Sequence, residues 1–240
     1  MVNNMKSEIK IRFTGKGLVV LFLMIIASTA TIKAQKIIDQ GVLTYDISYD
    51  LNDDQKKTID VEKLPSVSKV KFSGPLSKVE IDMGLATLKM TVDGPGRSAI
   101  LLVDAPLFQK QYATKFNKED LDKQGGNLSF KNFKATGEKL NIAGYESEKY
   151  TYQDNKDKNY EVWIAPELKL SPGAILPEFA TLKGTPVKYV SIQYGVKNVL
   201  TLKELKEEKT GPFSMTIPSG YEIKTPQEMD DMFKMLKGSN

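Results

Sequence analysis

The chain has 240 residues, with 34 Lys and Arg against 30 Asp and Glu, and it contains neither His nor Cys. Without these two residue types it cannot build a Ser-His-Asp triad, a Cys-His nucleophile pair, or a metal site of thiolates or imidazoles. The absence of Cys also excludes disulfides and a cysteine-linked lipid anchor. We therefore expect no cofactor, no enzymatic activity and a fold stabilised by an ordinary hydrophobic core.

The amino-terminal segment has the pattern of an export signal. Four basic residues between positions 6 and 16 precede the apolar run Leu18–Ala27. This run of about ten residues is typical of a signal peptide and is shorter than the roughly twenty that a membrane-spanning helix needs. Small residues follow, up to Ala34. We predict a signal peptide over residues 1–34, cleavage after Ala34, no permanent membrane span after processing, and a periplasmic or extracellular mature protein.

Removal of this segment changes the charge of the chain. Residues 1–34 hold five Lys and Arg and one Glu, so the mature chain keeps 29 basic and 29 acidic residues. A neutral chain offers no general electrostatic attraction for nucleic acid, so we expect no nucleic-acid partner. Residues 35–240 show no linker, low-complexity tract or repeat, which favours a single domain.

Alternation of apolar and polar residues predicts strands through most of the mature chain. In Leu43–Tyr49 every odd position is apolar or aromatic. Similar runs at Lys78–Asp82, Ala86–Val92 and Ser98–Val103 predict a meander, with Asp93–Gly96 as a turn. The remaining predicted strands are Leu128–Thr136, Glu138–Ile142, the hairpin of Ser147–Gln153 and Tyr160–Ile164 around the turn Asp154–Lys158, and the hairpin of Val187–Tyr194 and Asn198–Lys206 around Gly195.

Helices are few in this pattern. The clearest begins after Thr225, where Pro226 and Glu228 complete a capping box with proline at the first helical position. Shorter helices are predicted at Ala174–Lys183 and Lys118–Lys123. The fold class is therefore α+β and β-rich: a sheet of about eight to eleven antiparallel strands with one or two amphipathic helices on its concave face.

Carboxylates are the remaining groups that could support catalysis. The adjacent pairs Asp53–Asp54 and Asp230–Asp231 do not converge, because neighbours point to opposite faces of a strand and lie about 100° apart on a helix. The turn Asp154–Lys158 lacks the acidic residue that would end a calcium loop. A carboxylate-based hydrolase is the weakest of the three functions that we consider.

Two groups of side chains are candidates for lining an apolar ligand cavity. Tyrosines and a tryptophan on strands can fill a core or line a cavity. The apolar stripe of the last predicted helix, with its thioethers, can pack on a sheet or accommodate a lipid. The candidate cavity residues are Tyr45, Tyr150, Tyr152, Trp163, Met229, Met232, Phe233 and Leu236.

Short sequence blocks resemble exported bacterial proteins related to the lipoprotein carriers of the LolA/LolB type. The blocks are Gly41–Tyr45, Ile142–Tyr150, Glu161–Leu168, Leu182–Val187 and Pro218–Tyr221. The resemblance implies a strongly curved antiparallel half-barrel closed by helices, with an apolar cavity that accepts acyl chains in the carriers. It implies no catalytic residue.

Two functions from different classes follow. The first is an exported binding protein that holds an apolar ligand, such as a lipid or a lipidated protein, in a half-barrel cavity. The second is a structural or interaction module of the cell envelope, with a packed interior and a protein partner. A shared fold does not decide between them.

Overall fold

The computed structural model describes residues 36–82, 85–124, 129–193 and 196–238. Residues Lys36–Asn240 group into one compact unit. The predicted signal peptide, residues 1–34, and its cleavage site lie outside the described residues, as do Leu128 and the predicted turn residue Gly195.

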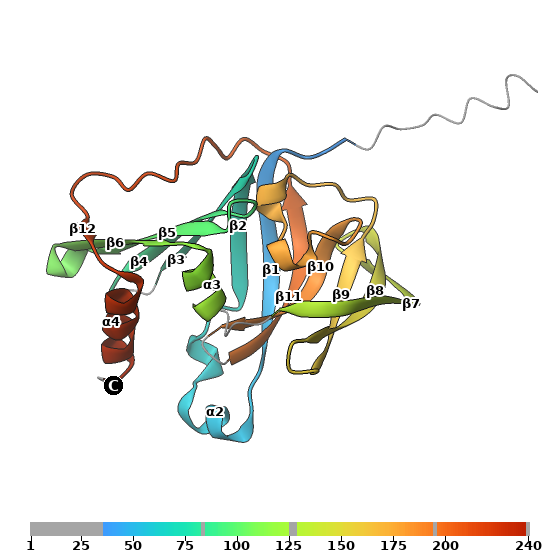
Figure 1. Cartoon of the computed structure of the whole chain (residues 1–240), viewed down its shortest axis with the longest axis horizontal. Coiled ribbons are helices and arrows are strands. Elements are labelled where there is room, and N and C mark those ends of the chain that lie inside the picture. Colours follow the sequence, from blue (N-terminus) through green and yellow to red (C-terminus); the bar gives the residue numbers. More distant parts are fainter. Residues whose placement is uncertain (1–35, 83–84, 125–128, 194–195, 239–240) are drawn as a thin grey trace, which may run out of the picture. The chain divides into compact units, whose positions relative to one another are not determined.

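One curved, open sheet of twelve strands forms the body of this unit (Figure 1). Its spatial order is β12-β6-β5-β4-β3-β2-β1-β11-β10-β9-β8-β7, and all neighbours are antiparallel except β12 and β6. The strands are β1 (Gln40–Asp50), β2 (Val67–Ser73), β3 (Leu76–Asp82), β4 (Thr87–Asp93), β5 (Ser98–Ala105), β6 (Lys110–Phe116), β7 (Phe130–Ile142), β8 (Tyr145–Asp154), β9 (Asn159–Ala165), β10 (Thr185–Gln193), β11 (Val196–Lys206) and β12 (Glu222–Ile223).

The β-rich class is confirmed, but the strand number exceeds the predicted eight to eleven. Strands β2, β6 and β12 were not predicted, although β2 alternates apolar Val70 and Phe72 with lysines. Two predicted segments form the single strand β7, whose pairing with β8 shifts in register at two places. The parallel pairing of β12 with β6 also departs from a wholly antiparallel sheet.

Two of the predicted helices are present, α3 (Lys118–Gln124) and α4 (Pro226–Gly238), and a further helix, α2 (Asp53–Thr58), was not predicted. The capping box of α4 forms: the backbone N–H of Thr225 donates to Glu228 at 2.7 Å, and the backbone N–H of Glu228 donates to the Thr225 hydroxyl at 3.2 Å. Within the described residues, none of the helices is both long and apolar enough to cross a membrane.

The helix predicted at Ala174–Lys183 is wrong. Two short 3₁₀ turns, η3 (Pro172–Ala174) and η4 (Pro177–Phe179), occupy this segment instead. Pro177 interrupts the predicted helix, because its ring blocks the hydrogen bond of a helix interior and disfavours helical backbone in the residue before it. Leu176 is accordingly extended, with φ −65° and ψ 132°.

The buried apolar side chains form two separate clusters on the inner face of the sheet. The first cluster joins β1, β2 and β7–β11, with Phe72 and Val162 fully buried. The second cluster joins β4, β5 and β6 to α3 and α4. Strand β3 lies between them and carries no buried residue, so it separates the two cores.

Different elements cover the two clusters. Residues 166–184 contribute Leu168, Leu170 and the buried ring of Phe179 to the first cluster. Helices α3 and α4 contribute Leu121 and Met229 to the second. Figure 1 shows α4 beside β4–β6, on the opposite side of β1 and β2 from β7–β10. The predicted helical cover is therefore present over one part of the inner face, and a loop with two 3₁₀ turns covers the other.

We expect Phe179→Ala to destabilise the protein by about 3–5 kcal/mol, because it removes a ring that is 1% exposed from the centre of the first cluster. Urea unfolding followed by circular dichroism would measure this loss. Phe108→Ala is the matched control: its ring is 64% exposed, so the free energy of unfolding should change by less than about 0.5 kcal/mol. Equal effects of the two substitutions would contradict the packing role of residues 166–184.

Candidate functional site

The four predicted aromatic residues do not occupy one environment. Tyr45 and Tyr152 are buried in the first cluster, at 3% and 1% exposure, and Tyr150 is half-buried against it. Trp163 alternates along β9 with two buried core residues, so it lies on the opposite face of the strand. Tyr45, Tyr150 and Tyr152 therefore belong to one core, and Trp163, although its position on β9 faces the other way, is also packed against that cluster.

Aromatic rings fill the centre of the first cluster. The ring centroids of Tyr152 and Phe179 are 5.7 Å apart, and those of Tyr45 and Tyr189 are also 5.7 Å apart. Burial raises the pKa of both Tyr45 and Tyr189, so these phenols stay neutral over the ordinary pH range. Such edge-to-face and stacked rings are the geometry of a packed core.

The predicted residues of the last helix belong to the second cluster. Met229 is 1% exposed, and Met232 and Phe233 are partly buried against the cluster. The side chain of Leu236 lies outside the described part of α4. The sequence therefore identified two real apolar groups, the strand tyrosines and the helical stripe, but they lie in different clusters rather than around one cavity.

The second cluster is less completely covered than the first. Among the described residues, five of its members are buried and eight are partly buried, whereas the first cluster has fifteen buried and fourteen partly buried members. We call its sheet surface the inner apolar face. It consists of Leu88, Met90 and Val92 of β4, Ala99, Leu101 and Val103 of β5, and Tyr112 and Phe116 of β6.

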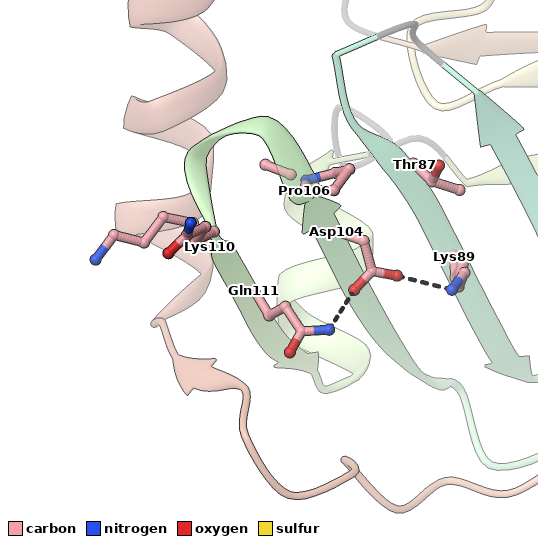
Figure 2. A pocket seen from close by; sticks show the side chains of 8 residues that line it. Thr87, Lys89, Asp104, Pro106, Lys110 and Gln111 are labelled. Atoms are coloured by element: carbon pink, nitrogen blue, oxygen red, sulfur yellow. Dashed lines mark hydrogen bonds and ion pairs between the residues drawn. The ribbon is translucent and has the colours of Figure 1, made fainter.

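The outer face of the same strands carries a shallow polar pocket of about 380 Å³ (Figure 2). Asp104 lies at its centre: Lys89 donates to one carboxylate oxygen at 2.7 Å, and Gln111 donates to the other at 3.0 Å. The pocket residues are Thr87, Lys89, Asp104, Ala105, Pro106, Gln109, Lys110 and Gln111. The sequence analysis did not identify these residues. They come from three strands, β4, β5 and β6, and from the connection between β5 and β6, so no single segment of the sequence marks the pocket.

Asp104 also receives a hydrogen bond from the Tyr221 hydroxyl at 2.6 Å. Burial acts to raise the pKa of Asp104, but the hydrogen bonds from Lys89, Tyr221 and Gln111 outweigh it and hold that pKa below its ordinary value. Burial and the bond to Asp104 raise the pKa of Tyr221 to about 12. The carboxylate is thus ionised and already saturated with donors, which suits a structural role better than acid-base catalysis.

The hydrogen bond of Tyr221 fixes the start of the segment that carries α4. Residue 221 directly precedes β12, which pairs with Tyr112 and Ala113 of β6. The N–H of Lys224 then donates to the carbonyl oxygen of Ala113 at 2.8 Å, and α4 begins two residues later. The polar group on the outer face therefore helps to hold α4 against the inner apolar face.

The described residues contain no group of three or more acidic side chains that could hold a metal ion. Asp154, in the predicted turn, is 2% exposed and accepts hydrogen bonds from the N–H groups of Lys156 and Lys158 and from the Tyr160 hydroxyl. These bonds close the turn. Asp53 and Asp54 are exposed and pair with lysines one turn along α2.

No protein-family model and no curated protein sequence matches this chain. Among solved structures, the lipoprotein LppX of Mycobacterium tuberculosis is similar over 82% of this chain and 99% of its own, with 12% identity and a TM-score of 0.34. MucB is similar over 75% of this chain and 57% of its own, with 10% identity and a TM-score of 0.27.

Both identities are below 25% and both TM-scores are below 0.5, so no statement about a family, a ligand or a site rests on these similarities. The inner apolar face under α4 is the candidate site on the geometry of the chain itself.

We expect Asp104→Asn to lower the free energy of unfolding at pH 7 by about 1–3 kcal/mol, because it weakens a partly buried charged acceptor shared by three donors. The pKa of Asp104 is lower in the folded than in the unfolded chain. Its contribution is therefore present above about pH 4 and is lost as the pH falls through the folded-state pKa. The difference between wild type and variant should shrink below that pH.

Denaturant unfolding at several pH values between 2 and 7 measures this difference. Asp54→Asn is the control, since the side chain of Asp54 is 92% exposed and its removal should leave stability nearly unchanged. A difference for Asp104→Asn that stays constant down to pH 2 would show that its ionisation does not contribute.

Proposed function

We propose that the mature protein is an exported, non-enzymatic binding protein that holds an apolar ligand, a lipid or an acyl chain, against the inner apolar face under α4. The observation that carries this proposal is the unequal cover of the two clusters. Aromatic rings fill the first, whereas Leu88, Met90 and Val92 of the second remain only partly buried beside α4. An apolar surface left half-covered within a sheet gains stability when an apolar ligand covers it.

The magnitudes suit an acyl chain. Each CH₂ group removed from water contributes about 0.8 kcal/mol, so a chain of modest length needs only apolar side chains and no charged anchor. The thioethers of Met90, Met229 and Met232 adapt to irregular apolar partners, which suits a ligand of variable length. The export signal predicted over residues 1–34 supports a role in the cell envelope or outside the cell.

A second function, an envelope interaction module with a protein partner, is favoured by a different observation. Leu107 and Phe108, in the connection between β5 and β6, are 72% and 64% exposed. Adjacent exposed apolar side chains of this size are a feature of contact surfaces. Capture of a stable protein partner by crosslinking, together with a lipid-free purified protein, would favour this function.

The primary test uses the mature chain, residues 35–240, after removal of lipid. Titration with a fluorescent fatty acid is expected to give saturable binding, and organic extraction of the protein before delipidation is expected to yield lipid. If there is neither saturable binding nor co-purifying lipid, the binding proposal is wrong.

We expect Met90→Glu to weaken this binding at least tenfold, because it places a carboxylate in the middle of the inner apolar face. Thr91→Glu is the matched control: it adds the same charge one residue along β4, on the outer face, and should leave binding unchanged. Fluorescence titration measures both affinities, and circular dichroism checks that both variants fold. Equal loss in both variants would place the ligand elsewhere.

A further inference from the structure

The polar pocket on the outer face has no part in the proposed function, which concerns the inner apolar face. Its volume of about 380 Å³ lies above the lower limit of about 300 Å³ for pockets that hold small ligands. Residues of β4, β5, β6 and the connection between β5 and β6 line it. Because the pocket opens on the surface, a ligand reaches it without displacement of any helix or strand.

Two polar side chains of the lining are held in place by Asp104. Lys89 donates to one oxygen of this carboxylate at 2.7 Å, and the side-chain amide of Gln111 donates to the other at 3.0 Å (Figure 2). Tyr221, from outside the lining, donates to Asp104 at 2.6 Å. Each of these bonds uses one donor, so the Lys89 ammonium keeps two N–H groups and Gln111 keeps its carbonyl oxygen for a ligand.

The other groups of the lining are of mixed chemistry. The Thr87 hydroxyl and the Gln109 amide can each donate and accept hydrogen bonds. Ala105 and Pro106 add an apolar surface between them. Gln109 has left-handed backbone, with φ 51° and ψ 37°, which favours glycine over other residues. Unfavourable backbone in a pocket residue is a feature of ligand-binding sites.

The charges in and around the pocket do not favour an ion of either sign. Inside the lining, Lys89 pairs with Asp104, and Figure 2 shows the side chain of Lys110 extending away from Asp104. The ammonium groups of Lys224 and Lys110 hold the pKa of Glu222 below its ordinary value. The remaining charged neighbours are Asp82, which lies opposite Thr87 on β3, and Glu80, which lies opposite Lys89 and pairs with Lys78. Lysines and carboxylates are thus present in similar number.

A neutral ligand with several hydroxyl groups suits these surroundings. Hydroxyl groups donate and accept, as the mixed lining requires, and they replace the hydrogen bonds of the waters that they displace. We propose that the pocket binds a neutral saccharide, whose hydroxyl groups bond to Lys89, Gln111 and Thr87 and whose C–H face lies on Ala105 and Pro106. This site is independent of the apolar ligand on the inner face.

The test records amide nitrogen–proton correlation spectra of the mature chain during titration with neutral disaccharides. Maltose, cellobiose and N,N′-diacetylchitobiose are each added to about 20 mM, well above the Kd of about 1 mM that we expect for a shallow polar site. At least one of them should shift the backbone signals of residues 104–111 and the side-chain amides of Gln109 and Gln111 saturably. If none does, the proposal is wrong.

Thr87→Val is expected to raise the Kd of the bound disaccharide about fivefold, since it removes one hydrogen bond and keeps the shape of the side chain. Thr87→Ser keeps the hydroxyl and should restore the affinity. Thr91→Val is the matched control, because Thr91 lies on the same strand and the same face but outside the lining. None of these variants removes a partner of Asp104, and circular dichroism checks that each folds.

Equal effects of Thr87→Val and Thr91→Val would place the saccharide elsewhere and overturn the proposal. Tighter binding of glucuronate than of glucose would overturn the assignment of a neutral ligand. Met90→Glu, on the inner apolar face, should leave the saccharide affinity unchanged while it weakens fatty-acid binding. The failure of either proposal is therefore distinguishable from the failure of the other.

Discussion

An open sheet of twelve strands has one inner face that other parts of the chain must cover, and the rest of the structure follows from how this cover is divided. Strand β3 contributes no buried side chain, so the inner face splits into two cores. Residues 166–184, with Phe179 at their centre, complete the first. Helix α4, with Met229, lies over the second. The two cores differ in chemistry: among the described residues, the first contains six buried aromatic rings, whereas Phe116 is the one aromatic residue among the five buried members of the second.

The two cores differ in how they are packed, and the proposed ligand site lies in the second of them. The first core packs rings against rings, which gives a well-defined and rigid arrangement. The second core is covered by α3 and by the amphipathic helix α4, which is attached through Tyr221, β12 and the capping box at Thr225. Those attachments are polar and lie at the beginning of α4, next to the buried side chain of Met229.

Much of the local structure could be predicted from the sequence. Alternation identified the cores of β1, β4, β5, β8 and β9, and the capping box identified the start of α4 correctly. The failures have physical causes. Pro177 prevents the helix that apolar spacing suggested, and β6 mixes alanine and lysines with its apolar residues, so its alternation is weak. The sequence did not indicate that the four aromatic candidates contact one cluster and that Met229, Met232 and Phe233 belong to another.

By itself, the sequence determined the excluded chemistry, the net charge of the chain, and the spacing of apolar residues along each element, since these properties depend on residue identity and short spacing. Only the tertiary structure decided which amphipathic surfaces share a core. It also brought Tyr221 to Asp104 across 117 positions and left the hydroxyl of Thr114 unpaired beneath an apolar surface. Such outcomes depend on strand order and register, which arise from the simultaneous burial of distant segments and leave no mark in the local pattern.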